Sequence, residues 1–316
     1  MINERMDVNH KILFIVGTIL AGSSLIICTS ICSAIIFSRR TRGRSFNLYL
    51  AALLIPDVVV NLVSLIINIV ELSLNDYMDS FSHAGCVFLA SVHGYYIFTN
   101  LWTSALICHE VYWLLKKSSK AIRFKPTKSK IVILRVAILH FSAIVGGLII
   151  YLILPLVGID ITSDPCLGTE SKGSFVFVIV LIILTIFPVL LYICYMTVDV
   201  YRSNLVPPTG KSRFVATFFI RTAILTTIFT LALAATVSIG KRIPSKFFDF
   251  LRSGQGIVIA GMSLMKPDVR KTTLYFVTCG MFGQKLTGPN IHASKSHGAS
   301  NRNDKRSFSM IIRQFF

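Results

Sequence analysis

Charged side chains are scarce in this sequence. Only 15% of its 316 residues are charged and 53% are hydrophobic, whereas a soluble domain carries about 25% charged residues. The mean hydropathy of +0.70 points the same way. Such a composition excludes an ordinary cytosolic enzyme and is typical of a protein that lies largely within a membrane.

The patterns of catalytic and metal centres are missing as well. The sequence has no P-loop, no Gly-x-Ser-x-Gly, no metal-ligand spacing and no acid pair at a plausible catalytic depth; His109-Glu110 lacks the second histidine that a zinc site needs. It shows no internal repeat of the kind that many secondary transporters carry, and no Asn-x-Ser/Thr sequon. We therefore expect neither an enzyme nor a metal site, and the missing repeat weakens a transporter interpretation.

Seven apolar stretches are present, and they are long enough to cross a hydrocarbon core of about 30 Å as helices. The seventh is short and contains Asp249, Arg252 and Gln255, but without it the basic end of the chain would lie outside the cell. We expect an all-α integral membrane bundle over residues 12–265, preceded by an extracellular N-terminus over residues 1–11. The first stretch predicts a retained signal-anchor helix. The stretches cover residues 12–38, 46–71, 86–115, 131–156, 174–201, 214–239 and 247–265.

The net charge of +18 is distributed unevenly along the chain. Basic residues gather after the first, third and fifth stretches, at 39–44, 116–130 and 202–213, whereas acidic residues gather in the alternate segments. By the positive-inside rule this pattern predicts an outside N-terminus and a cytoplasmic C-terminus. The basic loops are expected to attract anionic membrane lipids rather than nucleic acid.

Two segments follow the seventh stretch. Residues 266–280 predict a short amphipathic eighth helix at the membrane interface, with Cys279 at its end as a candidate for palmitoylation. Residues 281–316 are rich in Ser, Asn, Lys and Arg, and we expect them to form a disordered cytoplasmic tail. The eighth helix has apolar anchors at Val269, Leu274, Tyr275 and Phe276 and a basic face at Lys266, Arg270 and Lys271.

Of the seven cysteines, only Cys86 and Cys166 lie on the predicted outer side. Two oxidisable thiols in one compartment favour a disulfide. It would join the top of the third helix to the segment between the fourth and fifth, closing a loop of about 80 residues that the loop-entropy model values at roughly 4 kcal/mol. The alternative is two free cysteines.

Several polar residues fall inside the apolar stretches, where ionisable groups are costly and usually face the bundle interior. Asp57 lies in the second stretch with Asn61 one turn on; Asn100 lies at a similar depth in the third, and Gln255 could approach from the seventh. A carboxyl group there either stays protonated or finds partners. Asp57 is thus either a neutral, hydrogen-bonded core residue or a site linked to a bound ion or proton.

A polar and aromatic stripe follows one face of the third helix. It forms either the wall of a ligand cavity or a set of interhelical hydrogen bonds, and the sequence does not separate the two. Near the outer end of the seventh helix, Asp249 and Arg252 are three residues apart. A surface-exposed pair is the favoured interpretation, and contact with a charged ligand is the alternative. The stripe consists of His93, Tyr96, Asn100 and Thr103.

Five short runs stand at informative positions. The first run, residues 47–57, ends in Pro56-Asp57. The second, Glu110-Val111-Tyr112, lies near the inner end of the third helix. The other three are Phe187-Pro188, Ser253-Gly254-Gln255-Gly256 and Lys266-Pro267-Asp268-Val269-Arg270-Lys271. With seven helices and the Cys86 and Cys166 placement, these runs resemble the G protein-coupled receptor superfamily over residues 10 to about 280, with rhodopsin-like and cyclic-AMP-receptor-like features. The resemblance implies an extracellular ligand, a heterotrimeric G protein partner and, near Asp57, a sodium ion.

The departures from the superfamily pattern matter equally. Val111 stands where the family has arginine, and the sequence lacks Asn-Pro-x-x-Tyr in the seventh helix, Cys-Trp-x-Pro in the sixth and Trp in the fourth. The standard switch chemistry therefore does not carry over, and a divergent branch is implied. Glu110, without an adjacent arginine, is expected either to pair with Arg135 or Arg221, on the fourth and sixth helices, or to face water at the membrane interface.

Taken together, these features predict a plasma-membrane receptor. Its ligand cavity would be walled by helices two, three, six and seven, and its signal would be a population shift that exposes a partner site at the cytoplasmic ends of helices three, five and six. One alternative is a small transporter or channel whose pathway uses Asp57, Asn61, His93 and Asn100. Another is a non-signalling seven-helix membrane protein, which Val111 keeps open.

Overall fold

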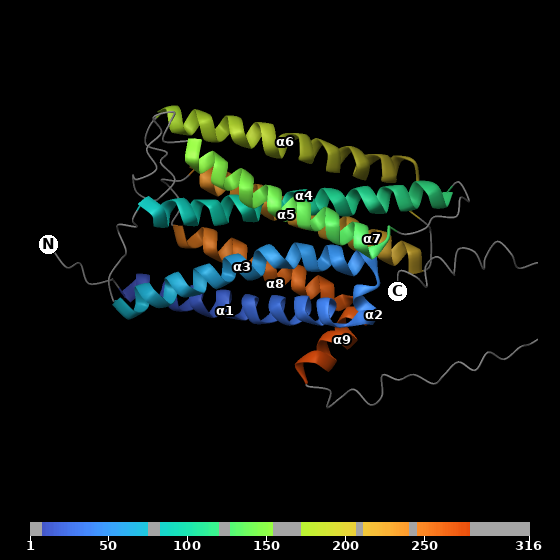
Figure 1. Cartoon of the computed structure of the whole chain (residues 1–316), viewed down its shortest axis with the longest axis horizontal. Coiled ribbons are helices and arrows are strands. Elements are labelled where there is room, and N and C mark those ends of the chain that lie inside the picture. The colour runs from blue at the N-terminus through green and yellow to red at the C-terminus, as the bar shows by residue number, and fades with distance from the viewer. Residues whose placement is uncertain are drawn as a thin grey trace, which may run out of the picture.

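The computed structural model describes residues 8–74, 83–119, 127–153, 172–206, 211–239 and 245–278, and within them the chain is helical and contains no strand. Two short helices, α2 (Arg39–Arg42) and α9 (Pro267–Val277), accompany a set of long ones (Figure 1). The long helices are α1 (Val8–Phe37), α3 (Ser45–Leu74), α4 (His83–Ser119), α5 (Ser129–Ile153), α6 (Lys172–Arg202), α7 (Lys211–Ile239) and α8 (Ser245–Met265).

The seven predicted stretches correspond to these seven long helices of the described ranges. The largest differences in their ends are four residues, at the start of α1 (residue 8 against 12) and the end of α4 (residue 119 against 115). The predicted eighth helix is present as α9, which begins with Pro267 at its first turn. Proline suits that position because the first helical N–H groups have no partner within the helix.

Helix α4 occupies the centre of the arrangement. It packs against α3, α5, α6 and α7, whereas α1 packs against α3 and α8, and α7 also packs against α8. The long helices run alongside one another, and α9 leaves this alignment beside the end of α1 (Figure 1). The buried core accordingly takes side chains from several helices, including Ile35, Leu53, Ile107 and Phe219.

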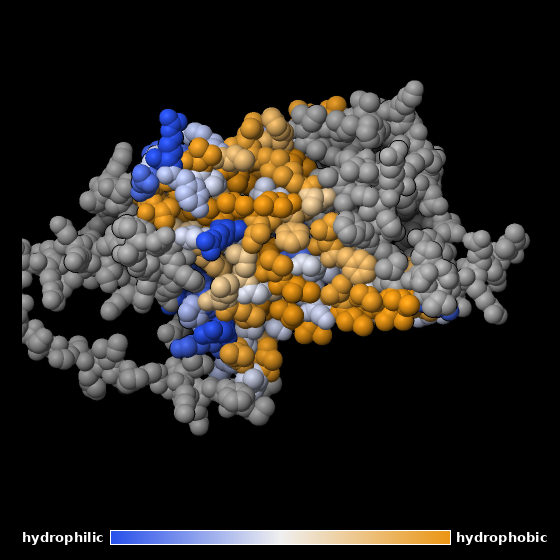
Figure 2. All heavy atoms as spheres, turned by 180° about the vertical axis from the view of Figure 1, so that it is seen from behind, coloured by the Kyte–Doolittle hydropathy of each residue, from blue (hydrophilic) through white to orange (hydrophobic). Residues whose placement is uncertain are grey.

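The described residues contain four helices long and apolar enough to cross a membrane. They are Phe14–Phe37, Ser45–Val70, Ser129–Leu148 and Leu184–Arg202. Many large hydrophobic side chains on these helices are exposed. The space-filling view shows hydrophobic residues over the middle of one face of the molecule (Figure 2). Hydrophilic side chains gather toward the end at which α2 and α9 lie (Figure 2). This pattern is that of an integral membrane protein whose apolar surface contacts lipid.

Candidate functional site

The polar residues predicted inside the bundle are buried where α1, α3, α4 and α8 meet. Asp57, Asn61, Asn100 and Gln255 all have no exposed surface. They project into the interior from three helices, α3, α4 and α8. The structure therefore confirms that these four residues are interior.

Asn61 is the hub of this buried polar layer. Its amide nitrogen donates to the Ser24 hydroxyl, at 3.1 Å, and to the backbone oxygen of Asp57, at 2.7 Å. Its side-chain oxygen accepts a hydrogen bond from the Ser253 hydroxyl at 2.9 Å. One side chain on α3 thus links α1 to α8, and sequence spacing gave no sign that Ser24 and Ser253 belong to the layer.

Asp57 is linked to the central helix by Tyr96. The Tyr96 hydroxyl donates to Asp57 Oδ1 at 3.0 Å, and both side chains are fully buried. Gly256 on α8 lies against the same carboxylate, since a Cβ added there would come within 3.4 Å of the Asp57 side chain and 2.5 Å of Ser24 Oγ. Close packing of α8 on α1 and α3 therefore depends on the absence of a side chain at residue 256.

Part of this layer has polar atoms that no described residue satisfies. Six side-chain atoms of the layer are buried and have no hydrogen-bond partner in the described part of the chain. They are Asp57 Oδ2, Thr103 Oγ1 and both polar side-chain atoms of Asn100 and of Gln255. A buried polar atom without a partner costs free energy, and such groups in native proteins usually contact water or an ion. The layer is thus suited to hold small polar species.

Arg252 lies toward the same end of the bundle as the start of α4. Only 1% of it is exposed, which corrects the favoured interpretation of a surface-exposed pair with Asp249. Its guanidinium donates to the Ser64 hydroxyl on α3 and lies 2.9 Å from His93 Nε2 on α4. The Asp249 side chain lies outside the described part of the structure. The three-residue spacing could not reveal which face of α8 turns inward.

The predicted cavity wall on α4 divides among different contacts. His93 contacts Arg252, Tyr96 contacts Asp57, and Asn100 and Thr103 lie among the unsatisfied groups. Interhelical hydrogen bonding therefore accounts for the first two residues. The other two face the polar interior deeper in the bundle.

Glu110 near the other end of α4 pairs with Arg135 on α5. Arg135 donates to Glu110 Oε1 at 2.5 Å, and the Thr127 hydroxyl lies 3.0 Å from Oε2 and 3.1 Å from Oε1. The Tyr49 hydroxyl adds a longer contact of 3.4 Å. Glu110 is only 7% exposed, so the alternative of a carboxylate facing water is wrong.

The remaining residues of the predicted cytoplasmic switch lie apart from this bridge. Arg221 is exposed, and among the described residues it forms no ion pair. Val111 is buried in the apolar core. The Tyr112 hydroxyl donates to Asp199 on α6 at 2.8 Å and lies 2.6 Å from Lys116 Nζ. Thus α4 is tied to α5 by Glu110 and to α6 by Tyr112.

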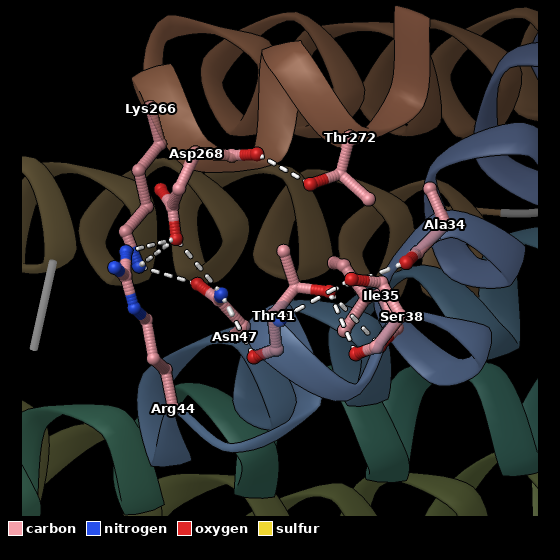
Figure 3. A network of polar contacts seen from close by, with 9 residues as sticks. All are labelled: Ala34, Ile35, Ser38, Thr41, Arg44, Asn47, Lys266, Asp268 and Thr272. Carbon is pink, nitrogen blue, oxygen red and sulfur yellow. Dashed lines mark hydrogen bonds and ion pairs between the residues drawn. The ribbon is translucent and has the colours of Figure 1, made fainter. Parts of the chain in front are cut away.

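A second polar cluster joins α9 to the bundle (Figure 3). Asp268 Oδ2 accepts from Arg44 at 2.7 Å and from Asn47 Nδ2 at 3.0 Å, and lies 3.7 Å from Lys266 Nζ. Lys266 also donates to the Asn47 side-chain oxygen, and its ammonium lies 5.8 Å from the centre of the Phe219 ring on α7. These contacts connect α3, α7 and α9 through the segment that follows α8.

Lys266 is therefore not part of the basic face predicted for residues 266–280. It is 2% exposed. Burial lowers the pKa of Lys266 from 10.5 to about 8, although Asp268 acts in the opposite direction. Burial alone would raise the pKa of Asp268, but Lys266, Asn47 and Arg44 together lower it. Val269 is likewise buried in the core rather than anchored in lipid, whereas Leu274 to Val277 stay exposed.

Two predictions fall outside the part of the chain that the structure describes. The Cys86–Cys166 disulfide depends on Cys166, in the segment 154–171, and on the Cys86 side chain. The palmitoylation candidate Cys279 follows the last described residue. Within the described ranges, no three His, Cys, Asp or Glu side chains are grouped so that they could hold a metal ion.

Comparison with known proteins gives this chain no relatives from which to transfer a function. No protein-family model matches it, and no curated protein matches it significantly. The residues and their geometry therefore carry the functional interpretation.

Proposed function

We propose that this chain is a seven-span membrane receptor of the G protein-coupled type, with its N-terminus outside the cell and its C-terminus in the cytoplasm. It senses an extracellular ligand and acts on a heterotrimeric G protein. The observation that carries the proposal is the set of buried polar contacts that runs from Arg252 and His93 through Tyr96 to Asp57. Ionisable groups inside a membrane bundle are expensive and mark functional sites by default.

The ligand would act on α8, α4 and α3 at the end where Arg252 lies. Arg252 and His93 belong to different helices, so a ligand that changes their contact changes how α8 sits against α4. Tyr96 is one turn further along α4 and bonds Asp57, so the change reaches the centre of the bundle. Binding then shifts the population between two packings of these helices.

The opposite end of the bundle holds the partner site. There the Glu110–Arg135 bridge ties α4 to α5 and the Tyr112–Asp199 bond ties α4 to α6. Arg221 on α7 is exposed and could contact an acidic partner. The same proposal includes the seven-span orientation and a location in the plasma membrane. It also includes the Cys86–Cys166 disulfide, attraction of the basic loops to anionic lipids, and lipidation at Cys279.

The residues around Asp57 fit a small hard cation. Small hard cations are coordinated by oxygen atoms. Three buried oxygens have no hydrogen-bond partner in the described ranges, namely Asp57 Oδ2, Asn100 Oδ1 and Gln255 Oε1. A sodium ion held there would supply positive charge beside the Asp57 carboxylate. The protein's own contribution is the Tyr96 hydrogen bond, which fixes the other carboxylate oxygen.

The test is exchange of GDP for GTP by a panel of heterotrimeric G proteins. Membranes with the wild-type chain are compared with empty membranes and with Glu110→Gln membranes, each with and without extract from the native surroundings. Exchange above empty membranes supports the receptor. Absence of exchange from protein shown to be folded contradicts it, and solute or proton flux in proteoliposomes would then favour the transporter or channel.

A further inference from the structure

The hydrogen bonds of His93 fix the position of its single imidazole proton. Nδ1 lies 2.8 Å from the backbone oxygen of Leu89, an atom that can only accept. Nε2 lies 2.9 Å from Arg252, whose guanidinium can only donate. Nδ1 therefore carries the proton, and Nε2 is the acceptor for Arg252. The ring is held as one neutral tautomer.

Protonation of His93 is incompatible with this arrangement. A proton on Nε2 would place an N–H group against the N–H groups of Arg252 and would set an imidazolium beside a guanidinium, so the contact changes from attraction to repulsion. Arg252 would keep its hydrogen bond to Ser64 on α3 but would lose its hydrogen bond to His93 on α4. His93 is half-buried, whereas Arg252 is almost fully buried, so protons reach the imidazole more readily than solvent reaches the guanidinium.

Two further titratable groups of the described residues, Asp57 and His140, lie near this contact. Asp57 on α3 lies within electrostatic reach of Arg252, and its Oδ2 has no hydrogen-bond partner in the described part of the chain, so when no cation is bound there it offers the released guanidinium an acceptor. His140 on α5 contacts Tyr95 at 2.7 Å and is a second histidine on a helix packed against α4. The Asp249 side chain, one turn before Arg252, lies outside the described part.

We propose that His93 and Arg252 form a proton-binding site through which acidification of the outer medium loosens α8 from α4. The proton binds Nε2, the His93–Arg252 hydrogen bond breaks, and Arg252 turns from α4 towards α3. The proton-binding step depends on the contact geometry alone. Two further parts of the proposal rest on the proposed function. These are that the protons come from outside the cell and that protonation of His93 alters signalling.

The first experiment uses the full chain in lipid nanodiscs, with isotope-labelled histidine, from about pH 8 to pH 5. One imidazole resonance, absent from His93→Gln, should show the neutral Nδ1–H tautomer at high pH and titrate within this range. Observation of the Nε2–H tautomer, or no titration of that resonance, would overturn the proposal. His140→Gln is the matched control, because it removes a half-buried histidine that has no contact with Arg252.

Thermal stability gives a second readout in the same nanodiscs. The Tm of the wild type should fall by about 4 °C more than that of His93→Gln between about pH 7.5 and pH 5, as expected for loss of one buried hydrogen bond to a charged group. Glutamine can still accept from Arg252 but cannot take up a proton in this range. Equal falls in the wild type and His93→Gln, or removal of the fall by His140→Gln, would contradict the proposal.

These readouts need neither a ligand nor a G protein, so they separate the proton site from the receptor. If His93 titrates as expected but no G protein exchanges nucleotide, the proton site stands and the receptor proposal fails. If exchange occurs but the wild type and His93→Gln have the same pH profiles in the nanodisc measurements, the receptor stands and the proton site fails.

Discussion

Gly256 lies where α8 approaches α1 and α3 most tightly among the described glycines. A methyl group there would come within 2.5 Å of Ser24 Oγ, whose hydroxyl accepts from Asn61, so relief of the clash would disturb that hydrogen bond. We expect Gly256→Ala to lower the free energy of unfolding by about 1–3 kcal/mol, measured as a fall in Tm.

Gly261 on the same helix is the matched control, because a Cβ there would meet nothing within 4 Å. Gly261→Ala should leave Tm unchanged or raise it, since alanine has the higher helix propensity by about 1 kcal/mol. In a Ser24→Ala background the cost of Gly256→Ala should shrink. Equal effects of the two glycine substitutions would mean that α8 does not pack on Ser24 as described.

Glu110 and Arg135 offer a second residue-scale test. Because Arg135 has 42% of its side chain exposed, solvent screens the bridge. Glu110→Gln should therefore cost about 1 kcal/mol, because the charge is lost while the amide oxygen can still accept from the Thr127 hydroxyl. In a double-mutant cycle with Arg135→Gln, we expect a coupling energy of at least about 0.5 kcal/mol. Strictly additive changes in Tm would show that the bridge contributes nothing.

The residue patterns predicted which side chains are buried better than they predicted the hydrogen-bond and ion-pair partners of those side chains. Asp57, Asn61 and Gln255 could be placed inside because each is a polar residue in an apolar stretch. Ser64 and Thr127 could not be found, because hydroxyl residues are common in such helices and nothing in their spacing marks them. Arg135 was one of two candidates for Glu110, and only the relative rotation of α5 and α7 decides between it and Arg221.

At the scale of elements, α9 is fixed to the bundle by Asp268 and by Lys266, of which the sequence placed only Lys266 on the polar face of the helix. The apolar anchors and basic residues of 266–280 predicted the helix, but which side faces the bundle depends on how the chain turns after α8. That turn buries Lys266 between Asn47 and Asp268 (Figure 3). The charges of Lys266 and Asp268 therefore dock α9 on the bundle.

The buried position of Lys266 makes the stability of this region depend on pH. The pKa of Lys266 is about 8 in the folded chain and 10.5 without burial, so between these values the unfolded chain binds more protons. The free energy of unfolding should therefore rise with pH over this interval, by up to about 3 kcal/mol. We expect Lys266→Met to remove this rise, measured as Tm against pH.

Lys271→Met is the control for that series, because Lys271 lies exposed on α9. It should keep the wild-type rise in Tm. Lys266→Met should also retain a folded chain, since Asp268 keeps its contacts with Arg44 and Asn47. Parallel profiles for the wild type and Lys266→Met would contradict the buried position of Lys266.

At the scale of the whole molecule, helix ends were predicted to within four residues because membrane thickness and apolar composition set them together. What composition cannot decide is how many helices cross the membrane. Four described helices are apolar enough by themselves, and α3 with its buried Asp57 is one of them; α4 and α8, which carry Asn100 and Gln255, are not. A polar helix can span only when its polar side chains are buried against neighbours, as Asn100 on α4 and Arg252 and Gln255 on α8 are.

Topology tests the central claim most directly. The sequence has no Asn-x-Ser/Thr, so a glycosylation acceptor inserted after Asp160, or appended with a spacer after Phe316, reports its own side of the membrane. Seven spans with an outside N-terminus predict a glycan at the first position and none at the second. If only the four most apolar helices crossed from an outside N-terminus, three crossings would precede Asp160 and four would precede Phe316. The glycan would then appear only at the C-terminal acceptor, and the seven-span account would be wrong.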